Sequence, residues 1–292
     1  MDQISGEHLF AATEAIHIMP TAQRDKGSRF TALHQQPGAF LIPNPWDAGS
    51  ARILASLGFE ALATSSGAAA GVNGRRDGKL SRDQALAQCR AIAEAVDIPV
   101  SGDLENGFGH SPAEVAETIR LAAAAGLVGC SIEDHTGDPA RLLYEISHAA
   151  ERIAAAAEAA KSLPFKFTLT ARAENFVRGK PDLDDTIRRL QAYEKAGADV
   201  LFAPALPDLA TVHQVCKSVS KPVNFMVAIR GKSFTVPELI DAGVKRISLA
   251  ASLYRAAMTG LIEAASEAKQ SGTFTYLDKT LTTAELIKFF PD

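Results

Sequence analysis

One ten-residue stretch carries most of the information on the fold, and it runs Val100-Ser-Gly-Asp-Leu-Glu-Asn-Gly-Phe-Gly109. Asp103 and Glu105 stand two residues apart at the end of a short apolar run, so in a β-strand both side chains point to the same face. The run then breaks into a glycine-rich turn. Paired acids at this position suit a hard divalent cation such as Mg2+ better than they suit an apolar core. We therefore predict a buried strand that ends in a metal site.

Two similar strand ends follow along the chain. They are Ile132-Glu-Asp-His135 and Thr170-Ala-Arg-Ala-Glu174. Polar residues at the ends of three successive apolar strands indicate the rim of an active site.

Apolar β-type runs alternate with alanine-rich amphipathic segments along almost the whole chain. The expected strands are residues 39–43, 61–65, 99–105, 129–135, 167–173, 200–205, 222–228 and 246–251. Most are continuously apolar, as is typical of parallel strands that are buried on both faces. The chain contains eight strand–helix units and no segment of different composition that would indicate another domain. This pattern predicts an α/β protein with a (β/α)8 TIM barrel. A doubly wound sheet is the rival, but the first strand is followed by Asn44-Pro-Trp-Asp-Ala-Gly49, which lacks the GxGxxG turn.

The pattern contains no domain boundary, so residues 1–292 are expected to form one barrel domain. Residues 1–37 precede the first strand and should form a helical extension. Residues 276–292 should form a helical tail, since Thr282-Thr-Ala-Glu285 is a capping box before a short apolar helix. This tail could pack on a partner subunit.

Composition narrows the class of protein. The net charge of -4 provides no basic field for nucleic acid, and charged residues interrupt every apolar stretch before it could span a membrane. The cysteines Cys89, Cys130 and Cys216 lie far apart, which is typical of a reduced protein. The polar start of the chain does not resemble a secretory signal. We expect a cytoplasmic protein whose partners are small molecules.

The site of a TIM barrel lies at the carboxyl ends of its strands. The acids concentrate on the third to fifth strands, and so much negative charge needs a cation, a shared proton or an arginine. We favour Mg2+, or Mn2+ in its place, bound directly by Asp103 and through waters by Glu105 and Glu133. The alternative is that these acids pair with Arg172 and only brace the barrel.

Three further groups have a functional and an ordinary interpretation. Arg172 could bind a substrate carboxylate or stabilise an enolate, or it could form a buried salt bridge, and the two roles are compatible. The small-residue turn at residues 64–68 could present N–H groups to an anion, or be only a tight turn. His135 is a candidate proton donor, although a loop histidine is the more ordinary interpretation. Asn224 and the loop at residues 228–234 should help to set substrate size.

Taken in order, these strand ends resemble the isocitrate lyase/phosphoenolpyruvate mutase superfamily. The matching segments span residues 45–52, 64–67, 102–107, 131–134 and 170–172. The resemblance covers roughly residues 40–255.

The resemblance implies a role for each residue. Asp103 would contact the metal, with Glu105 and Glu133 in its water-mediated shell. Ser66, Gly67 and Ala68 would hold the carboxylate of an oxo acid. Asp47 would lie near the metal waters, Arg172 would face the reacting group, and Asp77 would be the acidic residue of a mobile loop. Members are typically homotetramers that exchange C-terminal helices, which suits the tail.

Departures from the family pattern bear on the chemistry. The loop at residues 134–144 reads Asp-His-Thr-Gly-Asp-Pro-Ala-Arg-Leu-Leu-Tyr. It has neither the cysteine of the isocitrate-type lyases nor the lysine and asparagine of the mutases and phosphonopyruvate hydrolases. What remains resembles the cysteine-free branch, which decarboxylates or cleaves small 2-oxo acids such as oxaloacetate.

We therefore expect a Mg2+-dependent carbon–carbon lyase that acts on a small 2-oxo or 2-hydroxy acid through an enolate. The proton could come from water, His135 or Tyr144. Alternatives are a phosphonopyruvate hydrolase or mutase that acts on a carbon–phosphorus bond, and a non-catalytic carboxylate-binding barrel. A Schiff-base aldolase would need a lysine at the carboxyl end of a strand, and Lys166 is expected at the start of one.

Overall fold

Eight parallel strands form the sheet of the computed structural model, which describes residues 22–290. Neighbours follow the order β1-β8-β7-β6-β5-β4-β3-β2, and the Ala63 N–H donates to the Pro43 carbonyl oxygen at 3.0 Å across the remaining joint. This arrangement confirms the (β/α)8 barrel and excludes the doubly wound sheet, in which the strand order reverses. The strands are β1 Phe40–Ile42, β2 Leu62–Ala63, β3 Val100–Asp103, β4 Gly129–Glu133, β5 Thr168–Arg172, β6 Val200–Phe202, β7 Val223–Met226 and β8 Arg246–Ser248.

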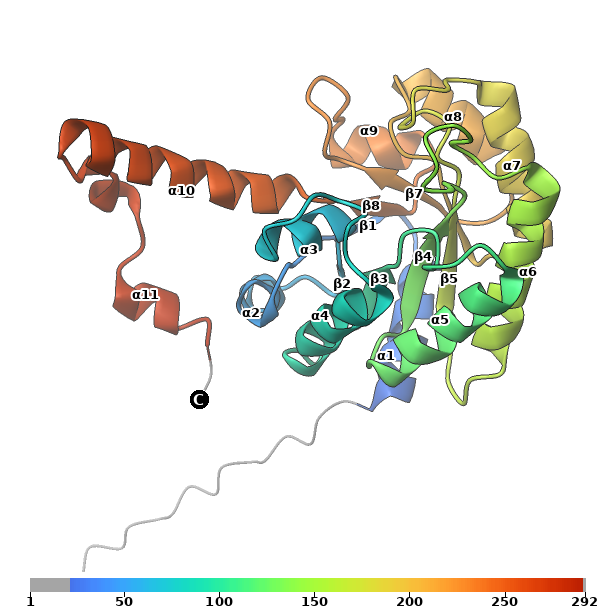
Figure 1. Ribbon diagram of the computed structural model, residues 1–292, viewed down its shortest axis with the longest axis horizontal. Coiled ribbons are helices and arrows are strands. Elements are labelled where there is room, and N and C mark those ends of the chain that lie inside the picture. Colours follow the sequence, from blue (N-terminus) through green and yellow to red (C-terminus); the bar gives the residue numbers. More distant parts are fainter. Residues whose placement is uncertain (1–21, 291–292) are drawn as a thin grey trace, which may run out of the picture.

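Helices alternate with the strands and surround the barrel (Figure 1). Side-chain caps fix where several of them begin: Ser111, for example, accepts from the Glu114 N–H and starts α5 with a proline in its first turn. The barrel helices are α2 Ala48–Ser56, α3 Ser66–Val72, α4 Arg82–Glu94, α5 Pro112–Ala124, α6 Ile146–Lys161, α7 Leu183–Lys195, α8 Leu209–Lys217 and α9 Val236–Asp241.

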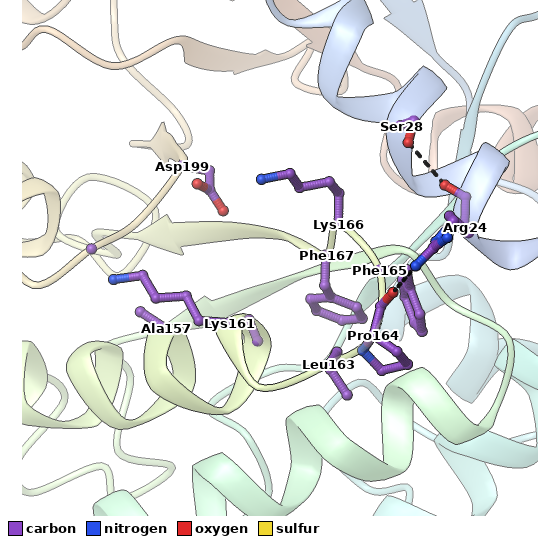
Figure 2. Close-up of a pocket in the computed structure, with 12 residues that line it drawn as sticks. Arg24, Ser28, Ala157, Lys161, Leu163, Pro164, Phe165, Lys166, Phe167 and Asp199 are labelled. Atoms are coloured by element: carbon purple, nitrogen blue, oxygen red, sulfur yellow. Dashed lines mark hydrogen bonds between the residues drawn. The ribbon is translucent and has the colours of Figure 1, made fainter.

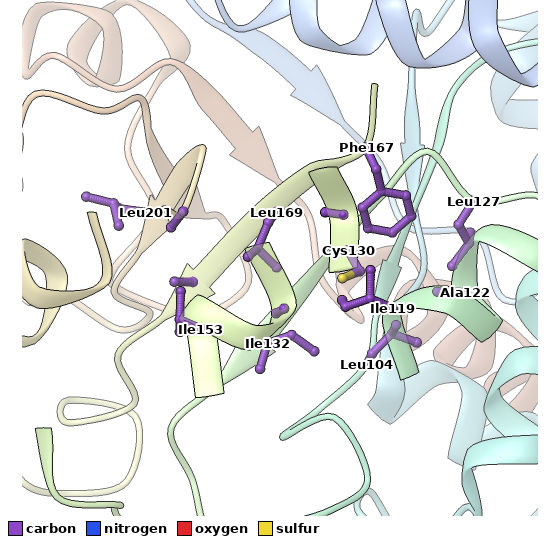
Figure 3. Packing of buried hydrophobic residues seen from close by; sticks show 14 of the residues in the cluster. Leu104, Ile119, Ala122, Leu127, Cys130, Ile132, Ile153, Phe167, Leu169 and Leu201 are labelled. Atoms are coloured by element: carbon purple, nitrogen blue, oxygen red, sulfur yellow. The ribbon is translucent and has the colours of Figure 1, made fainter. Parts of the chain in front are cut away.

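Alternation along the strands separates the core from the interior of the barrel. Cys130 and Ile132 of β4 are fully buried in the cluster against α5 and α6, together with Leu169 of β5 (Figure 3). Ser131 and Glu133 are the intervening residues of β4, so they point to the opposite, inner face. The interior therefore carries polar side chains toward the mouth, whereas the apolar core lies outside the strands.

The N-terminal extension is confirmed where it is described. Helix α1, Gln23–Leu33, crosses the amino end of β5 and buries Phe30 completely. A methyl group at Gly27 would overlap the Lys166 carbonyl oxygen, so this close crossing requires glycine. The part of the predicted extension before residue 22 lies outside the described residues.

The C-terminal segment leaves the barrel (Figure 1). Helix α10, Ser252–Ser271, has no buried residue, and Leu261 and Ile262 are 60% and 64% exposed. A 3-10 turn, Thr275–Lys279, leads to α11, Thr283–Ile287, which begins with the predicted capping box at Thr282. Exchange of this segment between subunits remains a prediction. No helix in residues 22–290 combines the length and apolarity needed to cross a bilayer.

Candidate active site

Three adjacent strand ends bring Asp103, Glu133 and Arg172 together, as the sequence predicts. Arg172 Nη1 lies 3.5 Å from Asp103 Oδ1 and 3.5 Å from Glu133 Oε2. The register explains the meeting: β4 pairs with β5 so that Glu133 stands opposite Arg172, and β3 pairs with β4 so that Asp103 stands opposite Ser131. The Arg172 guanidinium also lies over the ring of Phe202, 5.2 Å from its centroid.

A second arginine completes the cluster and was not predicted. The carboxylate of Glu174 is fully buried and accepts from Arg172 Nε at 2.5 Å and from Arg178 Nε at 2.8 Å. Arg178 Nη2 also lies 3.1 Å from Glu133 Oε1. The signal in the sequence is the four-residue spacing of Glu174 and Arg178, which places the two side chains together on a helical turn. Both interpretations of Arg172 therefore survive, since it stands at the mouth and is ion-paired.

Glu105 and Asp77 add negative charge beside this cluster. Burial raises the pKa of Glu105 to about 7, helped by the neighbouring carboxylates of Asp103 and Asp77, while Arg172 opposes the shift. Glu105 itself has a φ of 50°, a left-handed conformation that is uncommon outside glycine. Burial also raises the pKa of Glu133 well above its ordinary range, with Glu174 as the next cause.

The predicted anion-binding turn is the start of α3. Ser65 caps this helix by accepting from the Ala68 N–H at 3.4 Å, and the Ser66 N–H donates to Asp103 Oδ2 at 3.0 Å. Two of the N–H groups thus have acceptors. The Gly67 N–H has no acceptor among the described residues, and Gly67 faces the carboxyl group of Asp77.

The remaining predicted residues occupy distinct places. Asp47 caps α2 by accepting from the Ser50 N–H at 2.7 Å. His135 is half-buried, with Nδ1 3.7 Å from Glu133 Oε1, and burial followed by the charge of Arg178 lowers its pKa. Asn224 is buried inside the barrel, where its amide bonds to Ser248 and to an arginine described below. Whether these residues act in catalysis stays a prediction.

Tyr144 does not face the acid cluster. Its hydroxyl contacts His110 Nδ1 at 2.5 Å, and its ring stacks on the buried guanidinium of Arg152, 4.2 Å from the centroid. Arg152 donates to the carbonyl oxygens of Asn106 and Gly109, at 2.9 Å for the second. Arg152 thus holds the turn that carries Glu105. Sequence reasoning missed it, because an arginine within an alanine-rich helix resembles an exposed residue.

A narrow pocket of about 40 Å³ opens beneath the acid cluster into the barrel. Its lining contains Asp103, Arg172 and Arg246, together with the apolar side chains of Phe202 and Met226. A larger cavity of about 630 Å³ lies at the amino end of β5, where Lys161 and Lys166 flank Asp199 (Figure 2). Since Lys166 precedes its strand, it is remote from the mouth, as expected.

The donors at the mouth fit a divalent cation. The carboxylates of Asp77, Asp103, Glu105, Glu133 and Glu174 outnumber the two guanidinium groups beside them, which contact Asp103, Glu133 and Glu174. Within residues 22–290, no three His, Cys, Asp or Glu side chains are arranged to coordinate one ion directly. Carboxylate oxygens with room for water between them are the environment that Mg2+ prefers, because it keeps several of its waters.

A TIM barrel with acids and arginine at the carboxyl ends of β3–β5 defines the class of protein: a barrel built to bind a small polar ligand at its mouth. The sequence pattern of the family described as phosphoenolpyruvate phosphomutase matches residues 30–269, and the chain belongs to this family. It is thereby a member of the isocitrate lyase/phosphoenolpyruvate mutase superfamily, which confirms the resemblance.

Characterised relatives catalyse different reactions. The chain is 31% identical to 2-methylisocitrate lyase of Escherichia coli over 258 residues, which are 85% of this chain and 86% of that protein. It is 28% identical to oxaloacetate decarboxylase of Bradyrhizobium diazoefficiens over 272 residues, covering 91% and 92%. The crystal structure of a putative lyase/mutase from Burkholderia cenocepacia superposes with a TM-score of 0.90 and 48% identity, covering 92% and 97%. Superfamily members are lyases or mutases that act on small carboxylates.

Proposed function

We propose that this protein is a Mg2+-dependent carbon–carbon lyase that cleaves a small 2-oxo or 2-hydroxy acid, with oxaloacetate decarboxylation as the leading reaction. One observation carries the proposal: at the mouth, the carboxylates of Asp77, Asp103, Glu105, Glu133 and Glu174 outnumber the guanidinium groups of Arg172 and Arg178. Asp103 would hold the ion directly, and Glu105 and Glu133 would hold its waters. When bound, the ion would supply Lewis acidity at the keto oxygen of the substrate.

Each nearby residue would have a defined task. The Gly67 N–H and the Ser66 hydroxyl at the start of α3 would bind the carboxylate of the substrate. Arg172 would place a fixed positive charge beside the developing enolate, and its contacts with Glu133 and Glu174 would hold it in one orientation. Breaking the bond to CO2 needs an electron sink and a later proton, but no catalytic base.

The loops at the mouth would help to deliver the proton and would exclude water from the reaction. His135 is half-buried beside Glu133, and burial keeps its pKa low, so at neutral pH the ring is largely neutral. We therefore propose that a water molecule, oriented by His135, delivers the proton. Asp77 stands on the loop at residues 71–80, which would close over the mouth during the reaction.

Carbon–phosphorus cleavage is the second candidate. The family to which the chain belongs includes phosphomutases, which favours it. The absence of lysine and asparagine from residues 134–144 speaks against it. A non-catalytic carboxylate-binding barrel is the third candidate.

A substrate panel tests the proposal. The purified protein with Mg2+ would be incubated with oxaloacetate, methylisocitrate, dimethylmalate or phosphonopyruvate, and pyruvate and phosphate would be followed with EDTA as control. Asp103→Asn should abolish EDTA-sensitive pyruvate release, whereas Asp25→Asn, an exposed position on α1, should leave it unchanged. Equal turnover in folded Asp103→Asn would refute the site. Release of phosphate would favour carbon–phosphorus cleavage. Ligand binding without turnover would favour the non-catalytic carboxylate-binding barrel.

We also propose that the chain assembles into a tetramer through its C-terminal segment. Helix α10 and the segment after it expose Leu261, Ile262, Phe274, Leu277, Leu281, Leu286 and Ile287. A contiguous segment with this many exposed apolar side chains is typical of an interface.

The cysteines are free, which supports the proposed cytoplasmic location.

A further inference from the structure

Arg246 is a buried cation that no carboxylate contacts among the described residues, although the charge of Asp103 acts on it from the rim of the same pocket. It is the first residue of β8, is 3% exposed, and extends inside the barrel. Its Nε donates to Asn224 Oδ1 at 2.9 Å and its Nη1 to Thr170 Oγ1 at 3.0 Å. Both acceptors are neutral, and no ion pair within residues 22–290 reaches this guanidinium.

This arrangement differs from that of the other arginine in the pocket. Arg172 contacts Asp103, Glu133 and Glu174, so its charge is more than balanced. Burial lowers the pKa of Arg246 to about 10, which still leaves the group charged at neutral pH. An isolated buried charge is costly unless a counter-charge accompanies it. The interior of the barrel therefore carries an excess of positive charge at Arg246, and the rim above it carries an excess of negative charge.

The pocket provides room for the missing counter-charge. Arg246 lines the same pocket of about 40 Å³ as Arg172, together with the hydroxyl-bearing residues Ser101 and Ser131. A water molecule occupies about 30 Å³ in the liquid, so this space accepts a group of only a few atoms. A carboxylate is such a group, and guanidinium and hydroxyl donors are its usual partners.

We propose that Arg246 binds an anionic, carboxylate-sized group of the ligand, and that the pocket thereby selects small dianions over monoanions of the same size. The inference rests on the proposed function, because it assumes that the mouth binds a small carboxylic acid. Beyond the proposed function, it assigns a second negative charge to the acid and identifies Arg246 as the residue that binds this charge. Asn224 is then a positioning residue, since it acts on the ligand through Arg246.

One isosteric substitution separates binding from folding. Asn224→Asp places a carboxylate at the position of an oxygen that already lies 2.9 Å from Arg246 Nε, so it supplies the counter-charge internally. We expect the melting temperature to rise, while the affinity for oxalate, measured by calorimetry with Mg2+, falls about ten-fold or more. The affinity for the monoanion glycolate should fall much less. Gln214→Glu, exposed on α8, controls for added charge and should change the affinity for neither oxalate nor glycolate.

A second substitution separates contact from a general field. Arg246→Lys keeps the charge but loses the planar fork, so direct binding predicts a loss of oxalate affinity of about ten-fold. A field acting at a distance predicts wild-type affinity. Unchanged preference for oxalate over glycolate in both Asn224→Asp and Arg246→Lys would overturn the inference and assign a water molecule to the pocket. The proposed function would survive that result if Asp103→Asn abolished oxalate binding. Failure of the wild-type protein to bind either acid would overturn both.

Discussion

The raised pKa of Glu105 has a measurable effect on stability. The unfolded chain should titrate this group near 4.5, whereas burial and the carboxylates of Asp103 and Asp77 raise its pKa to about 7 in the folded protein. Between these values the folded state binds more protons than the unfolded state, so stability falls as pH rises through the window. Each pKa unit corresponds to about 1.4 kcal/mol, and the full displacement therefore to about 3 kcal/mol as an upper value.

Glu105→Gln removes this titration and keeps the shape of the side chain. We expect the two proteins to be about equally stable at pH 4.5, and the variant to be more stable at pH 8 by up to about 3 kcal/mol. Urea unfolding at a series of pH values, without divalent ions, measures the difference. Carboxylates remote from Glu105 cancel, because they titrate alike in both proteins.

A matched control should respond in the opposite direction. Hydrogen bonds from the Ser111 backbone and hydroxyl lower the pKa of Glu114, so Glu114→Gln should lose a little stability at pH 8 and gain none. Saturating Mg2+ at the proposed site should reverse the order for Glu105, because the ion would stabilise the ionised form that only the wild type has. A difference between the wild type and Glu105→Gln that is flat with pH would refute the reasoning.

The other predictions concern packing, chemistry and assembly. Arg152→Met leaves buried carbonyl oxygens without a donor and should cost about 3 kcal/mol in urea unfolding, whereas Arg120→Met removes only an exposed ion pair and should stay within about 0.5 kcal/mol. An equal cost for both would contradict the role of Arg152. Arg172→Lys keeps charge but loses the fork, and should reduce turnover by about 100-fold with little change in melting temperature. Wild-type kcat in this variant would remove Arg172 from the reaction. Leu261→Glu should reduce the mass seen by light scattering, while Lys269→Glu on the same helix should not. An unchanged mass would place the interface elsewhere.

The fold was predictable because its signal is periodic. All eight expected strands overlap the observed ones, since long apolar runs between capped helices leave few alternatives. Ends were less accurate: the run at residues 99–105 predicts a longer strand than β3, because Glu105 turns into a left-handed conformation that the apolar pattern does not encode. The predicted capping box at Thr282 was a better guide, and α11 begins directly after it.

The site was predictable only in part. Asp103, Glu133 and Arg172 meet because strand ends in a barrel must meet. Arg178 and Arg246 were missed for different reasons. Arg178 lies in a turn after its strand, and its spacing from Glu174 is the only signal that the two side chains meet. Arg246 stands at the start of a strand, where sequence reasoning does not look for a site.

Side chains along β4 and β5 point alternately into the barrel and toward the helices, and this limits how the protein can evolve. Deleting one residue within Gly129–Glu133 would turn Ile132 into the barrel and Glu133 toward the helices, so the core and the site would be lost in one event. Substrate preference can thus drift through loops such as residues 134–144, where a change of length disturbs no register. The length of each strand is constrained both by the apolar core outside the barrel and by the polar site inside it. New specificities in proteins of this architecture should therefore arise from insertions between strands, and from point substitutions within them.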